Sequence, residues 1–321
     1  MENQPIAFAL RPLRIGEMLD RAVTMYVRNF VVFTALVLVV LAPITVVQSL
    51  NASAQVDQLN ASISVLTHIG DSSTTAQKKE TQKLATMQPA LLIITGVVLL
   101  LALFLSPVGT GAVAVGVSRL YRGEPLRFTD CFLASLRKWP AMMGISFLAL
   151  FMFIGWYLAT VIVTILAAVP GGLLIAKALP LAVILFVLAA IVLIACVLIL
   201  ILMILAIAFA FFSLVIERNG VGAALGSGFK RVFNRIEFWR ALLFALAILG
   251  VELGGTTISA TAAILVLVVL HSTLTYILLA SVVNALLSAF LTIFLVLYYF
   301  DVRIRNEGLA MPVTPTPVFI P

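Results

Sequence analysis

The fold is decided by one stretch, residues 181–216. It reads LAVILFVLAAIVLIACVLILILMILAIAFAFFSLVI, which is 36 residues without a charge. As a single α-helix it would be about 54 Å long, against a bilayer hydrocarbon core of about 30 Å. Such a run predicts a membrane-spanning helix that must tilt, protrude or break. One long helix and a broken helix with a re-entrant piece both stay open, because the Pro-Gly-Gly sequence at 170–172 and Pro180 lie just before it.

Five further apolar blocks accompany this stretch. The six blocks contain a single charged residue, Glu252. The whole chain is 63% apolar and 10% charged with a mean hydropathy of +1.21, whereas soluble domains carry roughly a quarter charged residues. A soluble domain of 321 residues could not cover so much apolar surface. We therefore predict an all-α polytopic transmembrane bundle with six spanning helices, at 30–47, 89–117, 140–169, 181–216, 241–270 and 274–300.

The distribution of Lys and Arg predicts the orientation of these helices. Of the 20 basic residues, 16 lie in alternate segments, at 1–29, 118–139, 217–240 and 301–321. The positive-inside rule places those segments, and both termini, in the cytoplasm. This divides the chain into a cytoplasmic segment 1–29, a transmembrane domain 30–300 and a short cytoplasmic tail 301–321. Residues 48–88 are then an extracytoplasmic loop, and 118–139 and 217–240 are basic cytoplasmic connectors.

Three of the basic segments have apolar residues at helical spacing, which predicts amphipathic helices lying on the cytoplasmic membrane surface. Thr129 or Asp130 is a suitable N-cap for the second of them. Because each helix precedes a pair of spans, two interpretations stay open: three repeated units, each an interfacial helix with a transmembrane hairpin, or three unrelated helices that anchor the ends of the spans. The predicted apolar stripes are Ile15, Leu19, Ala22 and Tyr26 in segment 11–29, Phe128, Phe132, Leu136 and Trp139 in segment 126–139, and Leu225, Phe229, Val232, Ile236 and Trp239 in segment 219–240.

The cations beside these stripes predict contacts with anionic lipid headgroups. A net charge of +7 could also indicate a nucleic-acid partner, but here the cations border apolar runs, which favours the lipid. A membrane-protein partner or a second copy of the chain is the other partner class that we consider. The candidate headgroup contacts are Arg14, Arg21, Arg28, Arg122, Arg127, Arg137, Lys138, Lys230, Arg231 and Arg235.

Four segments of the chain carry a resemblance to known proteins. They are RPLRIGEMLDRAVTMYVRNF at 11–30, SPVGTGAVAVGVSRLYRGEPLRFTDCF at 106–132, VIERNGVGAALGSGFKRVFNRIEFWRALL at 215–243 and LYYFDVRIRNEGL at 297–309. In this order they resemble the glycerophosphoryl diester phosphodiesterase membrane-domain family of bacteria. The resemblance implies a polytopic helical module of the bacterial inner membrane, joined to a catalytic domain in some proteins and alone in others.

The family name does not carry an activity over to this chain. A phosphodiesterase of that class requires carboxylates and histidines clustered around a divalent ion. The two histidines here, His68 and His271, have no carboxylate at metal-ligand spacing, and no nucleophile or phosphate-loop motif is present. We therefore expect no enzyme activity, no cofactor and no metal site.

Glu252 is the residue that could indicate a different function. It lies near the middle of its block, where a carboxylate is costly and is a candidate functional group. Asn284 and Ser288, on a polar stripe of the last block, complete the candidate intramembrane site. One hypothesis is a transporter or channel that couples to a proton or cation at Glu252. The other is a structural, protonated Glu252 hydrogen-bonded to Thr256, Ser259 or Asn284, and the leading functional hypothesis remains a non-enzymatic membrane module.

Overall fold

The computed structural model describes residues 13–47, 74–174, 178–235, 237–270 and 273–307. The structure is all-α: 91% of it is helical, and the described residues contain no strand. A helix at Phe30–Val47 follows the first labelled helix. The labelled helices are α1 (Ile15–Arg28), α3 (Thr74–Tyr121), α4 (Phe128–Leu136), α5 (Trp139–Leu174), α6 (Leu179–Ile216), α7 (Val221–Val232), α8 (Phe238–Leu270) and α9 (Thr273–Glu307).

Six of the described helices are long and apolar enough to cross a membrane, which confirms the predicted number of spans. Five of them begin or end within three residues of a predicted block, whereas the sixth, Ser281–Asn306, starts seven and ends six residues later than the predicted block 274–300. Because hydropathy is a local property of the sequence, these elements were readable without a structure. The six candidate spans are Phe30–Val47, Leu92–Tyr121, Trp139–Pro170, Leu179–Ile216, Phe238–Ala262 and Ser281–Asn306.

The long apolar block forms one unbroken helix, α6, of 38 residues. The preceding helix, α5, continues through Pro170 and the two glycines to Leu174. Helix α5 therefore ends later than expected, at Leu174, and Pro180 lies in the first turn of α6, where its missing N–H costs nothing. Of the two readings left open by the sequence, the structure has the single long helix.

Two predicted boundaries differ from the structure. Helix α3 begins at Thr74, so the second part of the predicted loop 48–88 is helical, while 48–73 lies outside the described residues. Helix α9 continues to Glu307, so the first residues of the predicted tail 301–321 are helical. Polar residues with good helix propensity precede the apolar stretch of α3 and follow that of α9, so each helix extends beyond its apolar stretch.

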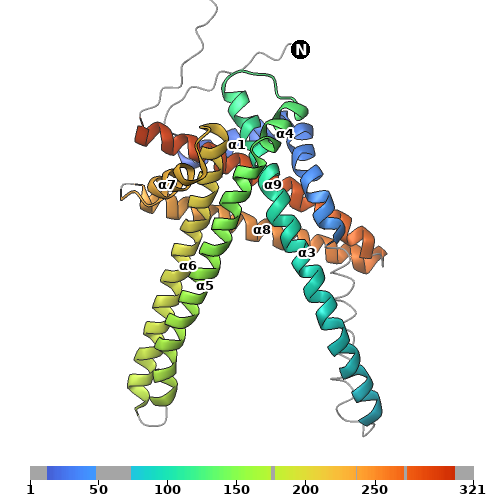
Figure 1. The fold of residues 1–321 in the computed structure, drawn as a ribbon, viewed down its shortest axis with the longest axis vertical. Coiled ribbons are helices and arrows are strands. Elements are labelled where there is room, and N and C mark those ends of the chain that lie inside the picture. Colours follow the sequence, from blue (N-terminus) through green and yellow to red (C-terminus); the bar gives the residue numbers. More distant parts are fainter. Residues whose placement is uncertain (1–12, 48–73, 175–177, 236, 271–272, 308–321) are drawn as a thin grey trace, which may run out of the picture.

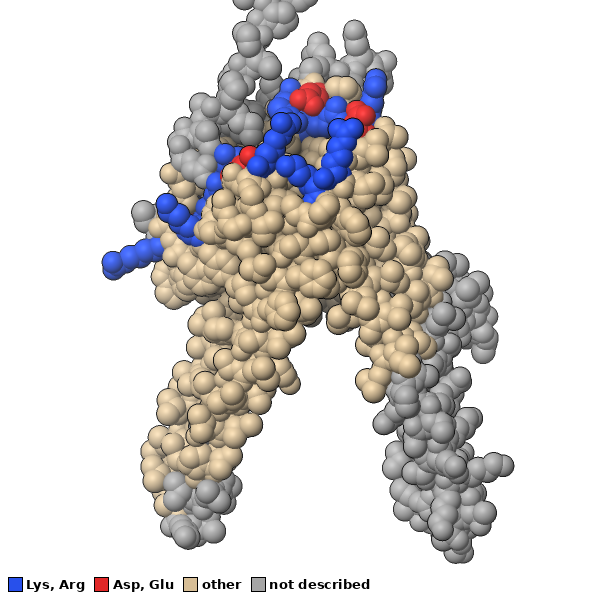
Figure 2. Space-filling model, in the orientation of Figure 1, with Lys and Arg blue, Asp and Glu red and all other residues tan. Residues whose placement is uncertain are grey.

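The helices form a body with two diverging arms (Figure 1). Helices α5 and α6 make one arm as a long hairpin, and α3 runs down the other. Helices α8 and α9 pack against each other and cross the body at a large angle to the α5–α6 hairpin. Helices α1, α4 and α7 gather at the end of the body away from the tips of the arms, and we call this the basic end because Lys and Arg crowd its surface (Figure 2).

The hydrophobic core lies in the body. Its centre is aromatic: the Tyr298 ring is stacked on Phe244 with 3.7 Å between the ring centroids, and it also contacts Phe209. Phe244 in turn contacts Phe294. Along the arms, large apolar side chains face outward, and Phe151 and Leu166 are 70% and 69% exposed. Exposing so much apolar surface to water would be unfavourable, whereas lipid tails would solvate it.

The three amphipathic helices form where they were predicted, but the buried faces of two of them match the predicted stripes only in part. In α1 the buried residues are Met18, Ala22 and Met25, and the predicted stripe residue Leu19 is exposed. These residues pack into the body, where α1 lies against α9, so the helix is more than a surface anchor. Ala22 of the predicted stripe is buried as expected, but Met18 and Met25, which the stripe left out, complete the buried face. Long, flexible Met side chains readily fill such an interface.

In α4 the buried side chains are Cys131 and Ser135, whereas Leu136 and Trp139 from the predicted stripe are exposed. The Ser135 hydroxyl donates to the carbonyl oxygen of Val108 at 2.7 Å, which explains how a polar residue occupies the buried face. The N-cap is Arg127, and neither Thr129 nor Asp130 takes that position. In α7, Leu225 and Val232 of the predicted stripe are buried, Trp239 is exposed on α8 and Ile236 lies outside the described residues.

Candidate functional site: charged clusters and a cationic surface at the basic end

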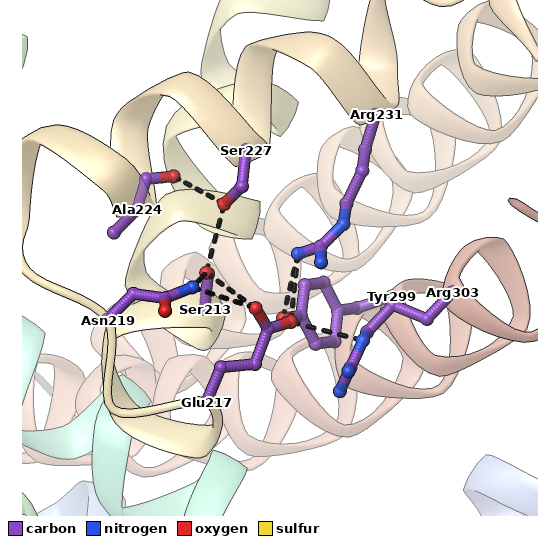
Figure 3. Close-up of polar contacts among 8 residues, drawn as sticks. All are labelled: Ser213, Glu217, Asn219, Ala224, Ser227, Arg231, Tyr299 and Arg303. Carbon is purple, nitrogen blue, oxygen red and sulfur yellow. Dashed lines mark hydrogen bonds and ion pairs between the residues drawn. The ribbon is translucent and has the colours of Figure 1, made fainter. Parts of the chain in front are cut away.

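The first cluster begins at the turn between α6 and α7. Helix α6 ends at Ile216, and Glu217 is its C-cap. Arg218 follows with φ of 60°, the left-handed conformation that side chains other than glycine rarely adopt. The side chains of Glu217 and Asn219, on either side of it, both turn inward to the same cluster (Figure 3), while Arg218 itself is exposed.

Glu217 is the centre of this cluster, and both of its carboxylate oxygens are used. Oε1 lies 2.9 Å from Arg231 Nη1 and 3.1 Å from Arg303 Nε, and it accepts a hydrogen bond from the Tyr299 hydroxyl. Oε2 accepts hydrogen bonds from Asn219 at 2.9 Å and from Ser213 at 3.1 Å. Three helices, α6, α7 and α9, are thereby tied together by one carboxylate (Figure 3).

The two guanidinium groups also lie over the Tyr299 ring. Arg231 is 5.2 Å and Arg303 is 5.9 Å from the ring centroid, and Arg231 donates to the Tyr299 hydroxyl at 3.0 Å. These are the distances of cation–π contacts, which are strengthened when the cation is desolvated. The cluster therefore buries charge without leaving the buried Arg231 uncompensated.

The pKa of Glu217 reflects this balance. Burial alone would raise the pKa, but the hydrogen bonds from Tyr299 and Arg231, with the positive charges of Arg231 and Arg303, outweigh it and hold the pKa below its usual value of 4.5. Glu217 is therefore ionised at neutral pH. An ionised carboxylate is what the two neighbouring arginines require.

A second cluster surrounds Asp301, which is 1% exposed within α9. Its carboxylate accepts the backbone N–H of Leu13 at 2.6 Å and pairs with Arg240 at 2.7 Å and Arg305 at 3.0 Å. Both arginines also donate to the carbonyl oxygen of Leu13, at 2.9 and 3.1 Å. The segment that enters α1 is thus fixed to α8 and α9, although Leu13 and Asp301 are 288 residues apart in the sequence.

A pair of ions and a hydroxyl near Asp301 are buried with unfilled hydrogen-bonding capacity. Arg240 and Glu237 form a long ion pair of 3.7 Å, and the Tyr298 hydroxyl is fully buried beside them. Within the described part of the chain, no protein group lies within hydrogen-bonding distance and geometry of Glu237 Oε2, Arg240 Nη1 or the Tyr298 hydroxyl. Such atoms are usually bridged by ordered water when they are this close together.

A third group of ion pairs joins the end of α3 to α4. Arg119 pairs with Glu124 at 3.0 Å and with Asp130 at 2.9 Å, and Arg122 also contacts Glu124. The acids of these pairs are more exposed than Glu217 and Asp301, so water screens the attraction and each pair contributes little to stability. Cys131 is fully buried next to them, and burial raises the pKa of its thiol.

Most acidic side chains at this end are therefore buried or form ion pairs, whereas several cations without an ion pair lie on the surface. Asp20 is an exception, since its side chain is exposed. Figure 2 shows the resulting band of Lys and Arg with few acids among them. Seven exposed cations have no ion pair within the described ranges: Arg14, Arg28, Arg127, Arg137, Arg218, Lys230 and Arg235.

The candidate headgroup contacts fall into three groups. Arg14, Arg28, Arg127, Arg137, Lys230 and Arg235 are exposed as a headgroup contact requires, Arg122 is exposed but paired with Glu124, and Arg21 and Lys138 are half-buried. The prediction of a headgroup contact does not fit Arg231, because only 9% of this residue is exposed and Glu217 neutralises its charge. Its position on the sequence beside Lys230 suggested a surface cation, but successive residues of a helix point about 100° apart.

The candidate intramembrane residues do not form a cluster among themselves. Glu252, Asn284 and Ser288 are all exposed. The Thr256 hydroxyl donates to the backbone carbonyl of Glu252 at 2.8 Å and not to its carboxylate. A carboxylate facing lipid at mid-depth costs roughly 2.5–3.5 kcal/mol on insertion scales. The exposed Glu252 side chain is therefore unfavourable in lipid when the chain is alone.

Sequence reasoning did not select Glu217, Tyr299, Asp301, Arg240 or Arg303 for a site. A signal existed, because Glu217 and Asp301 are each the first acid after a long apolar run, beside basic residues. Acids at that depth usually need a partner. Which arginine meets which acid depends on how the helix ends pack, and the sequence does not contain that information locally.

Comparison with known proteins adds no relative. No family model, curated protein or solved structure matches this chain. Among the residues that the structure describes, no three His, Cys, Asp or Glu side chains come together in a way that could hold a metal ion.

Proposed function

We propose that this chain is a non-enzymatic, multi-pass module of the bacterial inner membrane that binds anionic lipid headgroups at its basic end. The observation that supports it most is the separation of charge there. Glu217 and Asp301 neutralise cations in the interior, and the unpaired cations named above stay on the surface. A basic surface next to apolar spans attracts anionic lipid by about 1 kcal/mol per Lys or Arg.

We place the basic end on the cytoplasmic side, following the positive-inside rule. The exposed Trp239 supports a position at the headgroup level, because amphipathic aromatic rings prefer that depth. Trp139 is partly exposed at the same end, and its indole N–H donates to the Phe104 carbonyl at 2.9 Å. The resemblance to the glycerophosphoryl diester phosphodiesterase membrane-domain family is part of this proposal, since such modules occur without a catalytic domain.

Native mass spectrometry of the full chain tests the proposal. The protein would be purified in mild detergent and titrated with phosphatidylglycerol or with phosphatidylcholine. The triple variant R127Q/R137Q/K230Q removes three exposed cations, so we expect it to lose roughly 100-fold in phosphatidylglycerol affinity and nothing in phosphatidylcholine affinity.

The chain offers a matched control at the other end of α3. The triple variant K78Q/K79Q/K83Q removes the same charge near the start of that helix, far from the end that joins α4. We expect this variant to bind phosphatidylglycerol as the unmodified chain does. An equal loss in both triple variants, or equal binding of both lipids by the unmodified chain, would refute headgroup binding at the basic end.

A further inference from the structure

The inner stripe of α8 has a gap at Glu252. Glu252 lies on the same face of the helix as five residues that are buried or half-buried, but its own side chain is exposed. Spacings of three and four residues keep all six on one face. The five covered positions are Ala241, Ala245, Ile248, Gly255 and Ser259.

The gap arises because the two helices that cover α8 do so at different places. Near the basic end, Phe209 of α6 and Phe244 of α8 both pack on Tyr298. Further along, Leu287 of α9 packs against Gly255. Between these contacts the α5–α6 hairpin diverges from α8 (Figure 1), and the buried face of α6, apart from residues that meet α5, begins only at Leu202.

Glu252 has no partner in this gap. It lies about 20 Å along the helix from Trp239, well inside the candidate span Phe238–Ala262. No side chain of the described residues hydrogen-bonds or pairs with its carboxylate. Gly250 and Gly254 flank it with open space where a side chain would stand, so another helix can approach closely here.

We propose that this face of α8 receives a transmembrane helix of another protein that carries a Lys or Arg at mid-depth. Charge complementarity selects this occupant, because an intramembrane carboxylate is stabilised by a cation. A second copy of the chain cannot supply one, since Glu252 is the only charged residue in any of the six apolar blocks. The proposal is independent of headgroup binding, which uses the exposed cations of the basic end and not Glu252.

The experiment uses the full chain in phosphatidylcholine vesicles, where the basic end has no anionic lipid to bind. The probe is a fluorescent Leu/Ala transmembrane peptide of about 20 residues with one central Lys, and its Lys→Leu version is the control. Binding is measured by energy transfer from a donor on the protein. We expect the Lys peptide to bind on the order of tenfold more tightly than the Leu version.

Variants of the protein decide whether Glu252 is the contact. E252Q removes the charge with little change in shape, and we expect it to bind both peptides equally. T256A, at an exposed position one turn away, should leave the preference unchanged. E252K should reverse the preference towards a peptide with a central Glu, which a merely structural role of Glu252 would not produce.

Three outcomes would overturn the proposal. The first is equal binding of the Lys and Leu peptides to the unmodified chain, and the second is a Lys preference that survives in E252Q. The third is self-association of the unmodified chain, without peptide, that E252Q abolishes, because this would identify a second copy as the occupant. Circular dichroism of each variant in the same vesicles confirms that the fold is retained.

Discussion

Helices α6 and α9 are both long and apolar, yet their surroundings differ. In an 18-residue apolar window of each helix, 6% of the residues of α6 are buried inside the molecule, whereas 50% of those of α9 are buried. The arm that α6 forms with α5 presents Ile184 and Val187 outward, while α9 places Phe294, Tyr298 and Asp301 in the core. Apolar sequences therefore have two different surroundings here: lipid around the arm and packed protein around α9.

The difference teaches where stability resides. A side chain that faces lipid in the folded protein gains little from folding, because lipid tails are as apolar as a protein core. The packed aromatic centre and the charged clusters in the body therefore carry the tertiary structure. The following predictions compare matched changes in the two regions by thermal or denaturant unfolding of the full chain in detergent.

The largest effect is expected for Asp301→Ala. The change leaves Arg240, Arg305 and the Leu13 N–H without their shared acceptor in the interior. Breaking a buried ion pair on one side costs about 3–5 kcal/mol, and we expect a value near the upper limit. The control is the exposed Asp20→Ala, for which we expect less than about 0.5 kcal/mol. A loss below about 1 kcal/mol for Asp301→Ala would show that the cluster does not stabilise the body.

A matched aromatic pair compares body and arm directly. Phe244→Ala removes a ring that stacks on Tyr298, and it should cost about 3–4 kcal/mol, within the usual range for a buried Phe. Phe151→Ala removes a ring that is 70% exposed in the α5–α6 arm, and it should cost less than about 0.5 kcal/mol. Similar losses for both would mean that the arm packs against protein in the detergent-solubilised state.

A matched glycine pair in α7 predicts effects of opposite sign. A methyl group at Gly228 would meet the Ala206 carbonyl oxygen and the Ala210 backbone of α6, so Gly228→Ala should destabilise by about 1–3 kcal/mol. Gly226 has open space around it, so Gly226→Ala should stabilise by about 0.5–1 kcal/mol through helix propensity. The close approach of α7 to α6 would be refuted if both variants were stabilised.

The smallest effect is a dependence on pH through Glu217. Because its pKa is below the usual 4.5, Glu217 contributes stability that is fully present above pH 4.5 and is lost as the pH falls through the lowered pKa. Unfolding midpoints measured from pH 6 to pH 3 should therefore fall less steeply in Glu217→Gln than in the unmodified chain. Parallel curves for the two proteins would contradict the proposed ionisation.

Part of the fold and of the site was predictable from sequence, and Arg231 shows where prediction stopped. The number and type of the spans followed from hydropathy, and six of the candidate headgroup cations are exposed as expected. Arg231 follows Lys230 in the same basic segment, yet it is buried against Glu217. The buried faces of α1 and α4 were only partly predicted, since Met18, Cys131 and Ser135 are buried but lie outside the predicted stripes. The small Cys131 and the polar Ser135 carry too little hydropathy signal to mark a buried face.

By itself, the sequence determined that the chain is helical and crosses a membrane, because a run of about 20 apolar residues must satisfy its own backbone hydrogen bonds in lipid. Only the tertiary structure decided which charges are paired and which stay exposed. The partners of Glu217 and Asp301 come from residues as far as 86 and 288 positions away. Such pairing depends on where helix ends meet in space, and no local pattern of residues specifies that meeting point.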